Sequence, residues 1–426
     1  MIVLIVFILL LILGVPVAFV LLGSGMVYML TLKDPFLYLL MVPQRIFGGM
    51  NSYALLAVPF FILAGELMNQ SGITQRLIKF ATLLVGSFVG GLAHVNIIAS
   101  FIFGGISGSA VADVSSIGSI LIPAMVKEGY DLDFSTAVTI SSSLIGPIVP
   151  PSIPMIVYAY SSGISVASMF LAGYIPGALI AISLMIIAYI LSLKRKYPIK
   201  KIPLNLKNVR EISLEALPAI VMPIFIIVGI LSGIFTATEA AVVAVAYALI
   251  IGFIFRTIRF SDLPKIVGNS VRLASITYFV IAGGNVFGWV LTSQQIPQKA
   301  ASIILSLSIS PIIFLILIHI FLLMVGMFLD LLAATVILVP ILLPIALQLG
   351  VNPLHFGMVF CLSLIIGLIT PPVGLCLFVA SGITGLPIEK IFKSSVWFLT
   401  AEITVTILII FFPQIVLFLP KLFDLI

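Results

Sequence analysis

Two short segments place glycine, proline and hydroxyl side chains inside stretches that are otherwise apolar. They read GPIVPPSIP at 146–154 and GLITPPVG at 367–374. Proline lacks a backbone donor and clashes with the carbonyl one turn earlier, so each Pro-Pro pair is expected to open a helix and free carbonyl oxygens. Unpaired carbonyls in an apolar environment are costly unless they line a cavity or hold a ligand. Both segments are therefore candidate binding sites.

The chemistry available at these breaks suits a small hard cation. Each break follows another small-residue interruption, GGISGSAVADVSSIGS at 104–119 and GMFLDLLAAT at 326–335. Carbonyl and hydroxyl oxygens form a neutral cage, and unwound backbone with half-helix C-terminal ends can hold Na⁺. Interhelical hydrogen bonding between small residues is the alternative role for the serines, and the SGS motif does not show which serine would bind. The candidate ligands are Ser107, Ser109, Gly146, Val149 and Pro150 in the first half and Gly326, Gly367, Thr370 and Val373 in the second.

Broken helices also expose N-termini, whose N–H groups attract anions. A carboxylate substrate between the two interruptions would be held partly by main-chain donors.

Ionisable side chains are costly to place inside apolar spans, so each one is a candidate functional residue. Asp113 and Asp330 lie at the interruptions, either as proton carriers and neighbours of an ion site or as helix caps. Glu239 in FTATEAA predicts a capping box with Thr236 or Thr238. The others are Glu66, Glu402, His94 and His319.

The composition shows which elements must position these groups. The 426 residues are 62% apolar and 8% charged, with a mean hydropathy of +1.37. This indicates a polytopic membrane protein with ten to a dozen full or half-length segments, and it excludes a soluble enzyme, a nucleic-acid binder and a disulfide scaffold. The net charge of +6 is concentrated in loops, and residues 194–211 hold seven of the twenty basic residues. This stretch is predicted to be a cytoplasmic linker.

The chain carries no motif for nucleotide hydrolysis or for hydrolytic catalysis. A GxxxxGK[ST] loop, a HExxH pair and a Ser/His/Asp set are all missing from the sequence, and no polar stretch exceeds roughly twenty residues. We therefore expect no enzymatic activity and no organic cofactor. Any work must draw on an ion gradient or on another chain.

The two halves share their helix breakers. A shift of 221 residues superposes Gly105 on Gly326, Pro123 on Pro344, Gly129 on Gly350, Gly146 on Gly367, and Pro150-Pro151 on Pro371-Pro372. A two-residue adjustment then aligns residues 162–165 with 381–384. Interrupted segments at matching positions in two halves point to a transporter's midplane site. An odd number of spans in each copy would make the repeats inverted.

Six motifs in order carry a resemblance that covers essentially the whole chain: LLAVPFFILAGELM (55–68), GGISGSAVADVSSIGS (104–119), IGPIVPPSIPMIVYA (145–159), GIFTATEAAVVAVAY (233–247), GMFLDLLAATVILVPILLP (326–344) and IGLITPPVGLCLFV (366–379). The sequence resembles the large membrane subunit, DctM-type, of the tripartite ATP-independent periplasmic (TRAP) transporters. The resemblance implies an all-α polytopic membrane protein of the ion transporter superfamily. The expected fold is an inverted-repeat, elevator-type transporter with two re-entrant helical hairpins and two broken helices.

On this basis the chain divides into five parts. Scaffold helices are expected at 1–52 and 213–270, and a basic cytoplasmic linker at 194–212. The first repeat is expected at 53–193, with its hairpin at about 97–126 and its broken helix at about 134–160. The second repeat and a C-terminal helix are expected at 271–426, with the hairpin at about 320–349 and the broken helix at about 355–384.

The resemblance also implies Na⁺-coupled import of an organic acid anion across the bacterial cytoplasmic (inner) membrane. The substrate would be a C4-dicarboxylate, a sialic acid or a similar carboxylate, and the family's two sodium sites fall on the nine oxygen-bearing residues named above. Contacts to substrate or to the ion ligands are assigned to Asp113, Asp330, Thr335, Asn285 and Arg45. The expected partners are a small Q-type membrane subunit on a separate chain, a periplasmic P-type binding protein and the lipid bilayer, and no nucleic acid.

Two other functions remain open from the sequence. One is a stand-alone Na⁺- or H⁺-coupled carboxylate carrier of a related fold. The other is a structural or channel-like membrane subunit, although a channel would not need two matched interruptions.

Overall fold

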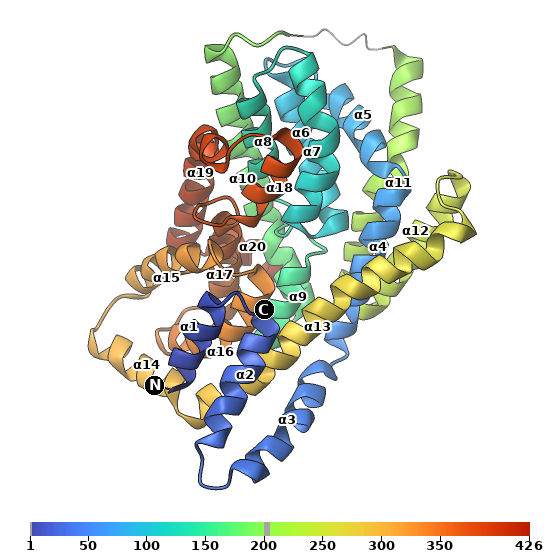
Figure 1. Ribbon diagram of the computed structural model, residues 1–426. Helices are drawn as coiled ribbons and strands as arrows, with labels where there is room; N and C mark the ends of the chain where they lie inside the picture. Colours follow the sequence, from blue (N-terminus) through green and yellow to red (C-terminus); the bar gives the residue numbers. More distant parts are fainter. Residues whose placement is uncertain (1, 200–204) are drawn as a thin grey trace.

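The computed structural model describes residues 2–199 and 205–426 (Figure 1). Within these ranges the regular structure is entirely helical. The first half contains α1 (Ile2–Ile12), α2 (Val17–Leu30), α3 (Pro35–Met50), η1 (Ala54–Leu56), α4 (Ala57–Gln70), α5 (Ile73–Val85), α6 (Gly91–Ser107), α7 (Ala110–Lys127), α8 (Leu132–Ser143), α9 (Ile153–Ser162) and α10 (Val166–Lys194). The second contains α11 (Leu206–Leu231), α12 (Ala237–Ile254), η2 (Phe260–Asp262), α13 (Leu263–Ser293), α14 (Ile296–Ser306), α15 (Pro311–Gly326), α16 (Leu331–Gln348), α17 (Pro353–Gly367), α18 (Leu375–Thr384), α19 (Ile388–Phe411) and α20 (Gln414–Leu422).

Seven of the described helices are long and apolar enough to cross a membrane, namely α7, α10, α11, α12, α13, α16 and α19. An eighth span results if α3 and α4, which meet at 66°, are counted together. Large apolar side chains such as Ile12 and Phe36 lie on the outside, 78% and 76% exposed. Such a surface is suited to lipid. The polytopic prediction is confirmed, and its half-length segments correspond to shorter apolar helices such as α6, α15, α17 and α18.

The helices that contain the predicted interruptions form two helical hairpins and two broken helices. Hairpin α6–α7 turns at Gly108, and hairpin α15–α16 turns through residues 327–330. The first broken helix is α8 and α9 with a break at 144–152, and the second is α17 and α18 with a break at 368–374. The Gly-Pro segments lie at these breaks, and both Pro-Pro bonds, Pro150-Pro151 and Pro371-Pro372, are cis. This confirms the predicted pair of hairpins and pair of broken helices.

Glycines with positive φ mark the repeat and correct its alignment. Gly129 and Gly350 follow the ends of α7 and α16 with φ of +91° and +78°. Gly163 and Gly385 end α9 and α18 with φ of +72° and +71°, a conformation that glycine adopts without strain. The alignment of residues 162–165 with 381–384 was therefore wrong, because Gly382 lies inside α18 and the equivalent of Gly163 is Gly385.

The linker predicted at 194–212 is described only in part. Residues 200–204 lie outside the described residues. Helix α10 continues to Lys194, and α11 begins at Leu206 with Asn205 as its N-cap, so the later part of the predicted linker is helical. The Asn205 side chain accepts a hydrogen bond from the backbone N–H of Lys207 at 3.2 Å, which is a standard start for a helix.

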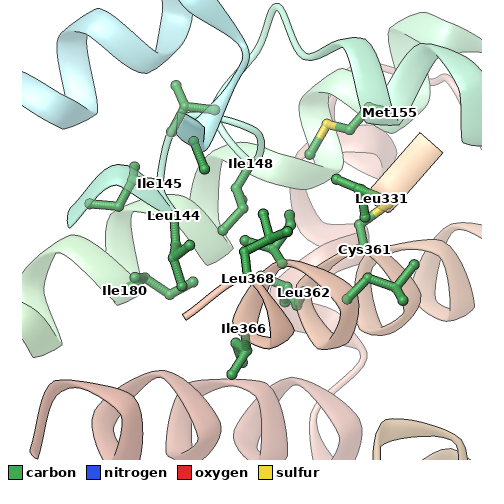
Figure 2. Packing of buried hydrophobic residues seen from close by; sticks show 14 of the residues in the cluster. Leu144, Ile145, Ile148, Met155, Ile180, Leu331, Cys361, Leu362, Ile366 and Leu368 are labelled. Atoms are coloured by element: carbon green, nitrogen blue, oxygen red, sulfur yellow. The ribbon is translucent and has the colours of Figure 1, made fainter. Parts of the chain in front are cut away.

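Buried apolar side chains form two clusters. The larger joins the hairpins to both broken helices, and Figure 2 shows Leu144 and Ile148 of the first break packed near Leu368 of the second and Leu362 of α17. The smaller joins α1, α2, α3 and α13, with Ala333 and Ile337 of α16 at its edge. The two breaks thus share one core, and a second group of helices packs beside it.

Candidate functional site

A cavity of about 100 Å³ lies where the two hairpin tips and the two broken helices meet. Four helices begin at its wall: α7, α9, α16 and α18. Each helix N-terminus carries partial positive charge on its free N–H groups, so their convergence favours an anion. The lining residues are Gly108, Ser109, Ala110, Val111, Pro147, Ile153, Pro154, Asp330, Leu331, Leu332, Leu368 and Leu375.

The tip of the first hairpin brings Ser107, Ser109 and Asp113 together. The Ser107 hydroxyl donates to Oδ1 of Asp113, and the backbone N–H of Ser109 donates to Oγ of Ser107 at 3.3 Å. The Ser109 hydroxyl caps α7 by accepting from the N–H of Ala112 at 3.4 Å. Asp113 is fully buried and its Oδ2 has no partner among the described residues. Ser109, not Asp113, is therefore the cap at this tip.

The tip of the second hairpin uses a carboxylate where the first uses a hydroxyl. Oδ2 of Asp330 accepts from the N–H of Leu332 at 3.1 Å and caps α16 at the cavity wall. The cap interpretation is thus correct for Asp330. Thr335 lies one turn further along α16, buried, and its hydroxyl donates to the carbonyl of Leu331 at 2.7 Å.

The first break contains main-chain carbonyl oxygens that are buried and have no hydrogen-bond donor among the described residues. The carbonyls of Gly146, Val149 and Pro150 accept no hydrogen bond from any residue that the structure describes. Glycines of α6 approach them closely: a Cβ added at Gly105 would lie 3.1 Å from the Pro150 carbonyl, and one at Gly104 would lie 2.7 Å from Cα of Gly146. The hairpin and the break therefore meet backbone to backbone.

The second break repeats this arrangement. In the described chain no donor reaches the carbonyls of Gly326, Thr370 or Val373, whereas the Gly367 carbonyl accepts from the N–H of Thr370 at 3.0 Å. The Thr370 hydroxyl donates to the Ile366 carbonyl at 3.0 Å, which leaves its lone pairs free to accept. Gly326 lies directly against Gly367. The nine predicted oxygen-bearing residues thus lie at two similar junctions, each made of one hairpin turn and one break.

Two of the predicted contact residues lie elsewhere. Arg45 on α3 is exposed and stacks its guanidinium over the ring of Trp289 on α13, 5.6 Å from the centroid. Asn285 on α13 donates to the Ile281 carbonyl at 2.9 Å and packs against Gly49 of α3. Neither residue lines the cavity, so both belong to the contact between α3 and α13.

Four of the five remaining ionisable candidates have local explanations, and the first of them, Glu66 on α4, accepts a hydrogen bond from Nε2 of Gln70 at 3.4 Å. Glu239 forms the predicted capping box with Thr236 at the start of α12. His94 bonds the Val89 carbonyl at 3.1 Å, and His319 bonds the Ser363 hydroxyl at 2.8 Å. Glu402 is the exception, because it is fully buried in α19 and neither carboxylate oxygen has a partner in the described part of the chain.

One site residue escaped the prediction although the sequence contains a signal for it. Ser152 caps α9, accepting from the N–H of Met155 at 3.4 Å, and its hydroxyl donates to the Pro147 carbonyl across the break at 2.6 Å. A serine two residues before a proline, directly after a helix break, is a standard helix start. The SIP sequence at 152–154 could have identified it.

Comparison with known proteins settles the family. Residues 4–415 match the family model of the tripartite ATP-independent periplasmic transporter, DctM component. The chain belongs to the DctM family. It is therefore a membrane subunit of a transport system and not an enzyme, as predicted, and the family works in general with a small membrane subunit and a periplasmic binding protein.

Relatives of this DctM component cover most of the chain. It is 39% identical over 412 residues to the sialic acid TRAP transporter large permease protein SiaM of Vibrio cholerae, with 96% of each chain covered. It is 39% identical over 378 residues to the C4-dicarboxylate TRAP transporter large permease protein DctM of Pseudomonas aeruginosa, with 88% of each covered. The crystal structure of the Alcanivorax borkumensis YdaH transporter has a similar fold, with a TM-score of 0.64, 14% identity and 90% of each chain covered.

Proposed function

We propose that this DctM component imports an organic acid anion together with Na⁺ across the cytoplasmic (inner) membrane, after a periplasmic binding protein has delivered the substrate. The observation that carries the proposal is the cavity at which four helices begin, flanked by two junctions of unpaired carbonyl oxygens. The same small region offers donors to an anion and acceptors to a cation.

The anion part of the proposal rests on the helix starts. None of the lysines and arginines that the structure describes lines the cavity, so main-chain N–H groups and the hydroxyl of Ser109 are the donors available to a carboxylate. Each helix N-terminus stabilises a negative charge by about 0.3–1 kcal/mol at an exposed site and by more when it is partly buried. Three of the four ends, at α7, α9 and α18, carry no carboxylate cap, and together they would take the role of a basic side chain.

The sodium part rests on the two junctions. At the first, the oxygens of Ser107, Gly146 and Val149 are supplied by one hairpin end and one break, and at the second those of Gly326, Thr370 and Val373 are supplied in the same way. We infer one Na⁺ at each junction. A cation bound there would lower the cost of bringing an anion into the cavity, and by linkage the anion would raise the affinity for Na⁺.

The substrate class that we propose is an organic acid. Relatives named for sialic acid and for C4-dicarboxylates are equally similar to this chain, at 39% identity. The cavity, at about 100 Å³, is smaller than the pockets of roughly 300–1,000 Å³ that hold drug-sized ligands. Import of a larger acid would require the cavity to widen.

The movement that we propose is of the elevator type. The hairpins and broken helices share the larger apolar cluster, whereas α1, α2, α3 and α13 form the smaller one. The first group would carry substrate and Na⁺ past the second, with the small membrane subunit bound to the stationary group.

Uptake by reconstituted protein tests this function. Proteoliposomes would contain this chain with its small membrane subunit, and radiolabelled organic acids would be added with their binding protein, with and without an inward Na⁺ gradient. We expect uptake to require both the gradient and the binding protein. Uptake that needs the binding protein but ignores Na⁺, under a proton gradient, would overturn the sodium assignment. Uptake that needs neither would overturn the whole proposal.

A further inference from the structure

A second cavity, of about 440 Å³, lies at the far end of α10 from the substrate cavity, beside the start of α19. Its wall combines basic, acidic and aromatic side chains. Arg195 follows the last residue of α10, Asp133 lies in the first turn of α8, and Lys390, Lys393, Ser394 and Trp397 lie on α19. The cavity therefore lies between the start of α8, the end of α10 and the start of α19.

One side of this cavity is fixed by hydrogen bonds. Nη1 of Arg195 lies 2.8 Å from Oδ2 of Asp131 and 3.2 Å from Oδ1 of Asp133. The Ser394 hydroxyl donates to Asp133 at 2.7 Å, and the Tyr197 hydroxyl donates to Asp131 at 2.8 Å. Burial lowers the pKa of Arg195, but its bonds to Asp133 and Asp131 raise that pKa above the ordinary value. The guanidinium of Arg195 thus stays charged, and it forms ion pairs with both Asp131 and Asp133.

The other side carries positive charge without an acidic partner. Lys390 and Lys393 lie three residues apart on one face of α19, and neither forms an ion pair with a described residue. Among the described residues that line the cavity, Arg195, Lys390 and Lys393 are basic and Asp133 is acidic. Such a pocket attracts an anion.

The surroundings indicate which anion. Trp397 lies seven residues after Lys390 and four after Lys393, so it is on the same face of α19 as both lysines. Its side chain is 58% exposed. Tryptophan is enriched where the hydrocarbon meets the headgroups. The face continues along this spanning helix through Ala401 to Leu408, which is 43% exposed. A charged pocket therefore passes directly into an apolar surface suited to acyl chains.

The cavity also lies at the end of the molecule with the most basic sequence. Helix α10 leads directly into residues 194–211, which hold seven of the twenty basic residues. Basic loops mark the cytoplasmic side, whose leaflet carries anionic lipids. A free phosphate ion would gain nothing from Trp397 or from the apolar face below it.

We propose that this cavity binds one anionic phospholipid, with its phosphate at Lys390 and Lys393, its glycerol region beside Trp397 and an acyl chain along α19. Bound there, the lipid would contact α19 next to the Asp131–Arg195–Asp133 network. It would hold the ends of α8, α10 and α19 together at the membrane surface.

Tryptophan fluorescence can test this site because the chain contains only two tryptophans. In the Trp289→Phe variant Trp397 is the sole emitter. The protein would be reconstituted in phosphatidylcholine vesicles with a minority of phosphatidylglycerol, and bromine would be placed on the acyl chains of one lipid or the other. We expect brominated phosphatidylglycerol to quench Trp397 more than its mole fraction predicts, and brominated phosphatidylcholine to quench it less.

Matched charge variants identify the residues responsible. The double variant Lys390→Gln/Lys393→Gln should lower the preference for phosphatidylglycerol about fivefold for each lysine removed. The control Lys265→Gln/Arg272→Gln removes the same charge from exposed residues of α13 and should retain the preference. Quenching by mole fraction alone would overturn the proposal, as would an equal loss in both double variants. Loss of the preference on addition of millimolar inorganic phosphate would assign the cavity to a free anion instead.

Discussion

At the scale of single residues, oxygen atoms rather than charged groups define the candidate transport site. Thr370 is the clearest case, because it is buried at the second break, donates its hydroxyl proton to Ile366 and keeps its lone pairs free. Its place before a Pro-Pro pair was enough to predict from the sequence that it lies at the second break. The different roles of Asp113 and Asp330 were not predictable, because a carboxylate near a helix start either caps the helix or is buried behind the cap.

Replacement of Thr370 by valine should weaken Na⁺ binding. The variant keeps the shape of the side chain but loses the only side-chain oxygen assigned to the second junction. A hydrogen bond or contact to a charged group contributes about 1.5–3 kcal/mol, so the Na⁺ concentration for half-maximal uptake should rise about tenfold or more. Titration of Na⁺ in the proteoliposome assay measures this change.

Thr406→Val is the matched control for that variant. Thr406 is also buried and also donates to the carbonyl four residues earlier at 3.0 Å, but it belongs to α19 and not to either break. The control should leave the Na⁺ dependence unchanged. Equal Na⁺ dependence in the two variants would remove Thr370 from the site.

At the scale of the elements, glycine allows the hairpins to contact the breaks. Gly146 lies against Asp113 and Gly104, and Gly367 lies against Gly326, so the two junctions are built in the same way. The breaks were predictable because Gly-Pro sequences interrupt a helix by known sterics. The exact correspondence of the two halves was harder to predict. The second half has one extra residue near its break, so Gly385, and not Gly382, is equivalent to Gly163.

Gly146→Ala should destabilise the protein. The added methyl group would lie 2.5 Å from Oδ2 of Asp113 and 3.2 Å from the Ser143 carbonyl, and both are buried. Overpacking of this kind costs about 1–3 kcal/mol. The melting temperature in detergent should therefore fall, and it is measured by intrinsic fluorescence.

Gly382→Ala provides the control for the same substitution. Gly382 is inside α18 with no atom within 4 Å of an added Cβ, so alanine should stabilise the helix by about 0.5–1 kcal/mol. If both alanine variants melt at the same temperature as the parent protein, the close contact at Gly146 does not limit stability.

At the scale of the whole molecule, the two apolar clusters meet along α13 and α16. Gly284 of α13 lies directly against Val336 of the second hairpin. Such a contact between clusters was beyond prediction from one sequence. The apolar lining of the cavity could not be predicted either, because the sequence does not distinguish Leu331, Leu332 and Leu368 from the other leucines of membrane helices.

A disulfide across this contact should stop transport if the two clusters slide past each other. A Cβ at Gly284 would lie 3.0 Å from Cβ of Val336, near the separation of about 3.5–4.5 Å found in disulfides. The variant Gly284→Cys/Val336→Cys would be made with Cys361 and Cys376, which are both free, replaced by alanine. Oxidation should abolish uptake and reduction should restore it, while the single variant Val336→Cys, which removes the methyl groups that face Gly284, should stay active under both conditions. Full uptake by quantitatively cross-linked protein would contradict the elevator movement.

The different caps of the two hairpins make the substrate cavity electrically one-sided. The tip of α7 presents a neutral serine, whereas the tip of α16 presents the carboxylate of Asp330. Two halves with similar backbones would therefore act on a ligand with opposite preference: the Ser109 end would attract a carboxylate, whereas the Asp330 end would repel it and accept hydrogen bonds from hydroxyl groups. We therefore expect a hydroxylated monocarboxylate to bind in one orientation only, with its carboxylate toward Ser109 and its hydroxyl groups toward Asp330.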